Sequence, residues 1–407
     1  MIWWLFFWQR RHRLLLTSAS IKCGFFAGVK RRRRQQGDSD LDKDILKKVS
    51  SLYFLNKIYL VFLIWLTREI LYPILPTKTD GLHPHVLLDS LIHWDAGWFL
   101  RIAGEGYTFE SAPFFPMLPF LIRLFSFVTG DFVVAGFLIT NIAFFVACYL
   151  FYRMVQEEYD EDLARTAVLY LLFFPTAVFF STIYSESLLL VFILSAFYFA
   201  RREKWFWAGF FGACAALTRN IGVVLFFAFL YGQLKNNSFK VNLKQLLSIL
   251  TIPAALLIFM FVLLAQTGDP LAFFHSLNTE YWGYRHFSYP GAGQWLSLKL
   301  FLYNNEFYSL FESTAAILFL FLVVLSFKYL KDKALLLFLV LGFLIPFSVV
   351  VDNLPLGMPR YIIVLFPAYI TLAAFLRKYG LSYVYSVLSI IAFSVISVMF
   401  TAGRWIS

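Results

Sequence analysis

The chain has 407 residues, of which 60% are hydrophobic and 14% are charged, and its mean hydropathy is +0.72. A typical soluble domain has about 25% charged residues, so this composition excludes an ordinary cytosolic enzyme, and also a disordered or disulfide-stapled protein. The apolar runs are continuous rather than alternating, which disfavours a transmembrane barrel. Since backbone polar groups in lipid must be satisfied within the segment, we expect an all-α polytopic membrane protein.

The formal net charge is +11, and much of it lies in the first fifty residues, including the run Lys30–Arg34. Such a run is compatible with nucleic-acid binding. Beside a membrane, a solvated tail attracted to anionic lipid is favoured. We therefore expect residues 1–50 to form a basic cytoplasmic arm that binds no nucleic acid, and residues 51–407 to form the transmembrane domain.

The second region contains about eleven apolar runs that are candidate membrane spans. Several are short, so those helices would stand nearly upright or be partly enclosed by protein. The runs are 52–73, 131–152, 165–182, 186–201, 205–218, 221–234, 244–266, 309–330, 334–351, 361–376 and 382–400.

A further apolar run, 113–129, contains three prolines and Arg123. If it spans the membrane, the basic loops around 201–204, 235–244 and 328–333 face outward. If it lies flat in the outer interface, these loops share the cytoplasmic side with the basic arm, which the positive-inside rule favours. The C-terminus and two long loops, about 74–130 and 267–308, are then outside. The acidic segment 157–162 is expected to be a solvated inner turn.

The first outward loop contains Asp95 between two tryptophans. Leu91, Trp94, Trp98 and Ile102 recur at helical spacing, which predicts a short interfacial helix over 89–103. On such a helix Asp95 would lie near the membrane surface, where a carboxylate can take a proton from a hydroxyl as general base. The alternative is that Asp95 only caps the helix.

Aromatic and polar residues of both outward loops are candidates for binding a sugar, because aromatic rings stack on sugar faces. Aromatic residues are also ordinary in membrane-interface belts, so this second interpretation stays open. Glycines in the second loop suggest a mobile cover over an outward-facing site. The candidate substrate-binding residues are His93, Trp94, Tyr107, Glu110, Glu186 and Trp282.

Three arginines, Arg219, Arg285 and Arg360, lie at or near outward span ends. Charges close to the hydrocarbon are costly and often mark a function, and an arginine fork matches phosphate oxygens. We expect these three to bind a lipid phosphate, the alternative being that they extend to the lipid headgroups. Glu186 begins a span, where it is either their acidic partner or a favourable charge for the helix dipole.

No metal or other cofactor is expected. His83, His85 and His93 are possible ligands, but no cysteine or tight acidic cluster completes a metal site. The three cysteines form no CxxC pair, and two of them lie inside apolar runs. There is also no phosphate-binding loop or nucleophile elbow.

Several short motifs resemble those of the PIG-V-like mannosyltransferases, relatives of the enzyme that adds the second mannose to GPI anchors. The resemblance covers roughly residues 50–375, and its motif in the first loop is the most specific. The motifs are HWDA at 93–96, RIA at 101–103, GY at 106–107, FFPMLP at 114–119, FFP at 173–175, YSES at 184–187, LTRN at 217–220, PRY at 359–361 and FP at 366–367.

The resemblance implies a GT-C-type fold and inverting transfer of a sugar, with mannose expected, from a polyprenyl-phosphate donor. In this class an acidic catalytic residue lies in the first outer loop, which carries membrane-surface helices, and Asp95 matches that residue. Arg219 and Arg360 match motif positions whose roles we infer from charge alone. The partners implied are the lipid-linked donor, membrane lipid, and a glycan, glycolipid or glycoprotein acceptor. The GPI acceptor itself is not implied.

Three other interpretations stay open. The first is a transporter or flippase of lipid-linked sugars, although charges here gather at span ends rather than at mid-membrane. The second is a GT-C enzyme that moves a different sugar, and the third is a non-catalytic assembly subunit. The compact loops favour a bacterial or archaeal plasma membrane, with the N-terminus cytoplasmic and the active site on the outer face.

Overall fold

A computed structural model describes residues 34–71, 87–236, 242–304, 307–351 and 357–404. The chain divides into two compact units, residues 1–43 and 44–407. Most of the basic arm lies outside the described residues. His83 and His85 of the first loop also lie outside them. The first helix, α2 (Arg34–Leu66), contains the end of the first unit, and the helices that follow it belong to the second unit.

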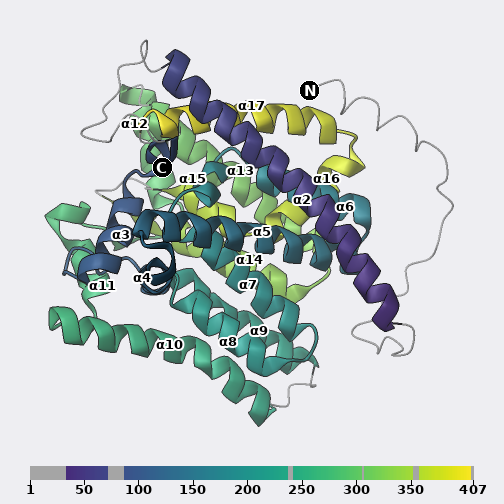
Figure 1. Ribbon diagram of the computed structural model, residues 1–407, viewed down its shortest axis with the longest axis horizontal. Helices are drawn as coiled ribbons and strands as arrows, with labels where there is room; N and C mark the ends of the chain where they lie inside the picture. Colours follow the sequence, from purple (N-terminus) through teal and green to yellow (C-terminus); the bar gives the residue numbers. More distant parts are fainter. Residues whose placement is uncertain (1–33, 72–86, 237–241, 305–306, 352–356, 405–407) are drawn as a thin grey trace. The chain divides into compact units, whose positions relative to one another are not determined.

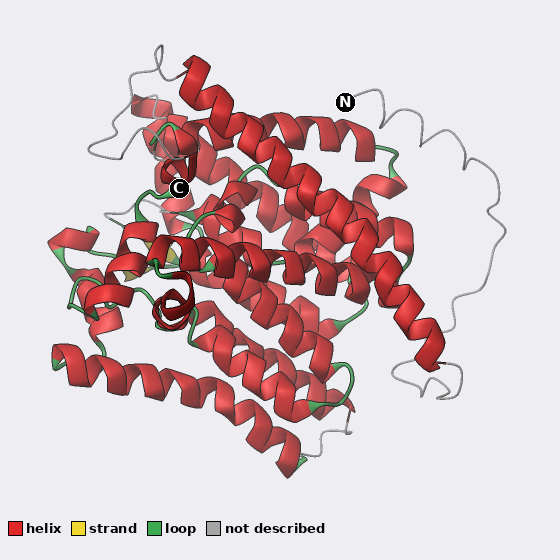
Figure 2. Ribbon diagram, viewed as in Figure 1, coloured by secondary structure: helices red, strands yellow, loops and turns green. Residues whose placement is uncertain are grey.

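The second unit is built almost wholly from helices (Figure 2). Among the described residues, five helices are long and apolar enough to cross a membrane, or six if one bent pair counts as a span. These five segments are Asp40–Leu71, Phe132–Glu158 (α5), Leu243–Thr267 (α10), Ser309–Tyr329 within α13 (Phe307–Tyr329), and Ser382–Thr401 (α17). The expected all-α polytopic class is confirmed.

Other apolar runs form shorter helices, so the expected number of eleven spans stays a prediction. They are α4 (Met117–Thr129), α7 (Glu186–Ala200), α8 (Trp205–Ala216), η5 (Asn220–Val223) with α9 (Val224–Asn236), and α14 (Lys333–Phe347). The remaining elements are η2 (Thr67–Leu71), η3 (Leu87–Leu91), α3 (Asp95–Glu105), α11 (Ala272–His275), η6 (Ser276–Asn278), η7 (Glu280–Trp282), β1 (His286–Phe287), α12 (Ala292–Asn304) and β2 (Val349–Val350).

Two of the expected continuous spans are broken. The run 165–182 forms α6 (Glu161–Leu172) and then η4 (Ala177–Ser181), with Pro175 between them. The run 361–376 is divided among α15 (Met358–Tyr361), η8 (Ile362–Val364) and α16 (Pro367–Lys378), with a bend of 88° before α16. Proline lacks the backbone donor of a continuing helix, which explains a break at each place.

The run with three prolines forms α4, which has 13 residues and is therefore about 20 Å long, well short of a hydrocarbon core of about 30 Å. In Figure 1, α4 is seen nearly end-on, whereas α5 and α10 run across the view. A helix that does not run alongside the spanning helices can lie along the membrane surface. This arrangement supports the flat placement that the basic loops favoured.

Close helix packing depends on small residues. Gly209 of α8 lies against α10, and a Cβ atom at Gly209 would come within 1.8 Å of the main-chain oxygen of Ser248. Small residues at such crossings allow two backbones to approach, which is how apolar helices gain van der Waals contact in lipid. Helix α7 packs between α5 and α8, and its residues are therefore almost entirely buried.

Two of the three basic loops expected on the cytoplasmic side, 201–204 and 328–333, are joined to the acidic segment 157–162 by ion pairs that we call the inner cluster. Its pairs are Arg201 with Glu158 (2.6 Å) and Asp332 (3.3 Å), Arg202 with Glu157 (2.6 Å), Arg153 with Glu157 (3.1 Å), and Arg377 with Asp160 (2.8 Å). The acidic segment 157–162 is therefore not simply a solvated turn, because its carboxylates bind the basic loops. Burial alone would raise the pKa of Asp160, but hydrogen bonds from Arg377 and Leu163 hold it below its ordinary value.

Candidate active site

The expected interfacial helix over 89–103 forms as two pieces, η3 and α3, and α3 begins at Asp95. Trp94 is the N-cap residue, with a φ of 47° and no side-chain capping bond. The capping alternative for Asp95 is wrong, because Asp95 is the first helical residue. Left-handed backbone at a bulky residue costs free energy and often marks a functional turn.

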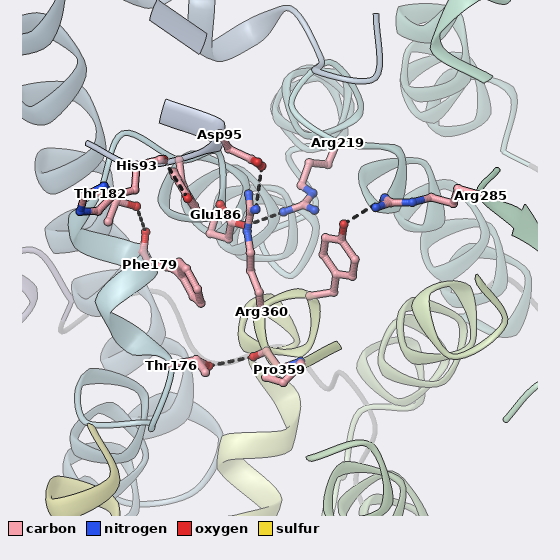
Figure 3. Close-up of polar contacts among 12 residues, drawn as sticks. His93, Asp95, Thr176, Phe179, Thr182, Glu186, Arg219, Arg285, Pro359 and Arg360 are labelled. Atoms are coloured by element: carbon pink, nitrogen blue, oxygen red, sulfur yellow. Dashed lines mark hydrogen bonds and ion pairs between the residues drawn. The ribbon is translucent and has the colours of Figure 1, made fainter. Parts of the chain in front are cut away.

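The Asp95 carboxylate is the first member of a chain of ion pairs (Figure 3). Its Oδ2 atom lies 2.6 Å from Nη1 of Arg360. The Nε atom of Arg360 donates to Oε1 of Glu186, and Nη1 of Arg219 donates to the same oxygen at 2.6 Å. One arginine therefore joins two carboxylates, and a second arginine completes the chain.

Two of these four charges are buried and two are partly exposed, although they come from distant parts of the sequence. Glu186 at the start of α7 is fully buried, and Arg360 in α15 is 5% exposed. Arg219 precedes η5, while Asp95 begins α3. The breaks in the two apolar runs described above place α7 and α15 so that their first turns meet. Buried charges of this kind are stable only when paired.

Two tyrosines complete the surroundings of the chain. The guanidinium of Arg360 lies 4.2 Å from the ring centroid of Tyr184, whose hydroxyl donates to the main-chain oxygen of His93 at 3.1 Å. Burial and the nearby Asp95 carboxylate raise the pKa of Tyr184, so it remains a neutral donor. Arg219 stacks 4.6 Å from the ring centroid of Tyr361.

Arg285 joins the group through Tyr361. Its Nη1 atom donates to the Tyr361 hydroxyl at 3.3 Å, while its Nε atom is buried and has no hydrogen-bond partner. Buried polar atoms are normally satisfied, so an unpartnered guanidinium nitrogen indicates space for an acceptor atom. We call Asp95, Glu186, Arg219, Arg285 and Arg360 the site cluster. Its three arginines exceed its two carboxylates by one positive charge.

The site cluster borders a cavity of about 310 Å³. Asp95 and the three arginines line it directly, together with many apolar residues. The apolar lining comes from α3 and the residues after it, from the second loop, and from the end of α14. A mainly apolar cavity with a few convergent charged groups is the usual form of a small-molecule site. The apolar lining residues include Phe99, Phe114, Phe273, Phe274, Trp282, Ile345 and Pro346.

The second long loop, about 267–308, covers part of this cavity and is anchored at two points. Trp282 Nε1 donates to the main-chain oxygen of Glu110 at 2.9 Å, and its ring lies 5.9 Å from that of Trp98. Strands β1 and β2 pair antiparallel, with His286 opposite Val350, and so tie the loop to the end of α14. The second loop, in which the glycines suggested a mobile cover, is therefore attached to the rest of the protein at both of these points.

Five of the six candidate substrate-binding residues do not line the cavity, and Trp282 is the exception. Glu186 is separated from the cavity by the arginines that it binds. The rings of His93 and Trp94 pack on Phe400 of α17, and burial lowers the pKa of His93. The Tyr107 hydroxyl donates to the main-chain oxygen of Phe114 at 2.7 Å. Glu110 contributes its main-chain oxygen to Trp282. These four residues shape the first loop, and their direct contact with substrate stays a prediction.

The structure adds two residues that the sequence reasoning did not single out, Tyr184 and Tyr361. Tyr184 belongs to the YSES motif and Tyr361 to the PRY motif, and that membership was the available signal. For metal binding, the described residues contain no group of three or more histidine, cysteine or acidic side chains arranged as ligands.

Comparison with known families gives a match to the model described as "Mannosyltransferase (PIG-V)" over residues 71–340. The chain belongs to this family. Membership of the family confirms the resemblance seen in the motifs. The GT-C-type fold is the fold that this resemblance implies. The matched region contains Asp95, Glu186, Arg219 and Arg285, whereas Arg360 lies beyond it.

Two curated relatives are both named GPI mannosyltransferase 2. The protein from Schizosaccharomyces pombe is 27% identical over 165 residues, which is 39% of this chain and 35% of the relative. The protein from Drosophila pseudoobscura pseudoobscura is 30% identical over 112 residues, which is 25% of each. The alignments thus span about a third or less of these relatives.

Among solved structures, the chain is similar to the Archaeoglobus fulgidus oligosaccharyltransferase. The crystal structure with zinc and sulfate has a TM-score of 0.42 at 12% identity, covering 85% of this chain and 52% of the other. The structure tethered to an acceptor peptide has a TM-score of 0.43 at 11% identity, covering 86% and 55%.

Proposed function

We propose that this membrane protein transfers a sugar, with mannose expected, from a polyprenyl-phosphate donor to an acceptor hydroxyl. The observation that carries the proposal is the meeting of the Asp95 carboxylate with three arginines at the wall of one cavity. A general base and an excess of positive charge are the two features that such a transfer needs. Membership of the mannosyltransferase family supports the choice of sugar.

Arg285 and Arg219 are the proposed phosphate ligands. The unpartnered Nε of Arg285 provides a free donor, and Arg219 contributes a second guanidinium that lines the same cavity. Arg360 was also expected to bind phosphate, but its guanidinium contacts both Asp95 and Glu186. In the proposed mechanism Arg360 therefore orients the base, and a phosphate on the other two arginines balances the remaining positive charge.

The reaction proposed is a single displacement at C1 of the sugar. The acceptor oxygen attacks from the face opposite the phosphate, Asp95 takes the hydroxyl proton, and the bond from C1 to the phosphate oxygen breaks with its electron pair. Attack on the opposite face inverts the anomeric centre, as water does in inverting glycosidases. The lipid phosphate leaves as an anion that the arginines stabilise, so no strong general acid is required.

The apolar lining supports a lipid-linked donor. Phe273, Phe274, Ile345 and Pro346 line the cavity together with the arginines. A prenyl chain attached to the phosphate would bury against such side chains, which is favourable in proportion to the apolar area covered. We place the reaction on the outer face of the membrane, with the N-terminus cytoplasmic, since the paired inner loops carry the basic residues. The membrane proposed is a bacterial or archaeal plasma membrane.

The acceptor is proposed as a glycan, glycolipid or glycoprotein. The curated relatives are named for GPI mannosyl transfer, which supports a mannose donor for this chain. We do not extend their acceptor to it, because the alignments span a third or less of those proteins. No metal or other cofactor enters the proposed reaction.

The test is sugar transfer by purified protein in lipid vesicles, with polyprenyl-phosphate mannose labelled in the sugar and simple mannosides as acceptors. We expect labelled product with an inverted anomeric centre. Consumption of other polyprenyl-phosphate sugars but not mannose would overturn the choice of sugar and keep the reaction class. Uptake of the lipid-linked sugar into vesicles without any transfer would overturn the enzyme and support a flippase.

A further inference from the structure

A buried carboxylate outside the site cluster lies next to the turn that carries Arg360. Glu312 is on α13, within the candidate span Ser309–Tyr329, and is fully buried. An acidic side chain inside a membrane segment is costly and needs polar partners to be stable. Its position therefore requires an explanation that general hydrophobic packing does not give.

Both oxygens of Glu312 accept hydrogen bonds from the backbone at the start of α15. Oε1 accepts from the Gly357 amide at 3.1 Å, and Oε2 accepts from the Met358 amide at 3.0 Å. Gly357 in turn accepts, through its main-chain oxygen, from the amide of Arg360 at 3.1 Å. The carboxylate of α13 is thus connected to the Arg360 backbone through a single residue.

Gly357 is required for this arrangement. Its φ is +78°, a conformation that residues with a Cβ rarely adopt, and a Cβ there would meet the Tyr361 ring at 3.1 Å. The glycine therefore lets Glu312 bond the turn on one side while the Tyr361 ring, which contacts Arg219 and Arg285, packs against it on the other.

The same turn is held from a second direction. The hydroxyl of Thr176, in the break between α6 and η4, donates to the main-chain oxygen of Pro359 at 2.8 Å (Figure 3). Glu312 and Thr176 thus fix the three residues before Arg360 and leave the Arg360 side chain directed at Asp95 and Glu186. A guanidinium that must meet two carboxylates at once tolerates little displacement of its backbone.

We infer that Glu312 is a positioning residue, which sets the backbone of Arg360 and, through it, the orientation of the Asp95 carboxylate. The inference rests on the proposed function for its kinetic consequence. Glu312 lines no part of the cavity and is placed in no contact with substrate. Its removal should therefore lower the rate of the chemical step more than it weakens donor binding by Arg219 and Arg285, which the turn reaches only through Tyr361.

The variant is Glu312→Gln, which keeps one acceptor oxygen and turns an NH₂ group toward a backbone N–H. We expect kcat to fall by about 10²-fold with a smaller change in the donor KM, because small misplacements in an active site slow the chemical step. Glu312→Asp, which restores both acceptors on a shorter side chain, should recover part of that loss. Ser313→Ala is the matched control, because the neighbouring Ser313 is also buried but bonds the main-chain oxygen of Gln294 instead.

A second measurement separates this inference from the proposed function. Amide hydrogen exchange of the peptide covering 357–364 should speed up in Glu312→Gln and remain at the wild-type rate in Ser313→Ala. Unchanged exchange in Glu312→Gln, or unchanged kcat in an active protein, would overturn the inference. If wild-type protein consumes no lipid-linked sugar, the proposed function fails, while the exchange rates still decide whether Glu312 holds the Arg360 turn.

Discussion

The two ends of α7 each carry a charged residue that belongs to a cluster of ion pairs, and the two clusters differ. Glu186 at its first residue belongs to the site cluster, and Arg201 at its C-cap belongs to the inner cluster. In the inner cluster four arginines face four carboxylates, and each arginine contacts at least one of them. That balance is what a structural tie between loops requires.

The site cluster lacks this balance. It has one more arginine than carboxylates, it borders a cavity, and one of its guanidinium nitrogens is buried without a partner. Buried charge alone therefore does not distinguish a binding site from a structural tie between loops. Unmatched charge beside an open volume does, because only a ligand can then complete the pairing.

Replacing one arginine in each cluster should separate their roles most clearly. Arg360→Lys removes the planar fork that meets Asp95 and Glu186 together, so we expect kcat to fall by about 10²-fold. Arg201→Lys removes the equivalent double contact with Glu158 and Asp332 and should leave kcat near the wild-type value while lowering thermal stability. Rates are measured on folded protein separated by size-exclusion chromatography. Equal losses of kcat in both variants would refute a functional difference between the two clusters.

Removing the unmatched charge should act on donor binding. Arg285→Gln eliminates the guanidinium that we assign to the donor phosphate, and a charge-assisted hydrogen bond contributes about 1.5–3 kcal/mol. We therefore expect the donor KM to rise by about tenfold or more, with a smaller change in kcat. Arg202→Gln, which breaks the inner pair with Glu157, is the control. A donor KM unaffected by Arg285→Gln would assign the phosphate to other residues.

The smallest effect is expected at the inner cluster and depends on pH. Because the pKa of Asp160 is lowered in the folded state, its ion pair contributes stability above its unfolded value of about 4, and this stability is lost as the pH falls through the folded value. Both partners are about half exposed, so the contribution is about 0.5 kcal/mol. Asp160→Asn keeps a helix-capping side chain. Thermal midpoints should differ at pH 7 and converge below pH 4, and a constant difference would contradict the account.

Local chemistry made much of this site predictable from the sequence. The HWDA motif indicated Asp95, and arginines beside apolar runs indicated Arg219 and Arg360, because charges near hydrocarbon are rarely accidental. The basic loops also predicted which segments share one end of the helices. Each of these inferences needs only residues adjacent in the chain.

Pairing between distant residues was not predictable in this way. Arg360 meets Glu186 across 174 positions, and Glu312 meets Met358 across 46. The broken helices that allow these contacts arise where α6 and α16 abut prolines, and hydropathy alone gave continuous spans over 165–182 and 361–376. Hydropathy averages over a window, so it does not detect a single-residue break.

The most direct test of the central claim compares Asp95→Asn with wild type in single-turnover transfer from polyprenyl-phosphate mannose. Asparagine preserves the size of the side chain but accepts no proton, so the account predicts a loss of about 10²–10⁴-fold in rate with donor still bound. Asp160→Asn serves as the acidic control at the other end of the molecule and should transfer at the wild-type rate. A folded Asp95→Asn protein that transfers mannose at the wild-type rate would contradict the assignment of Asp95 as the base.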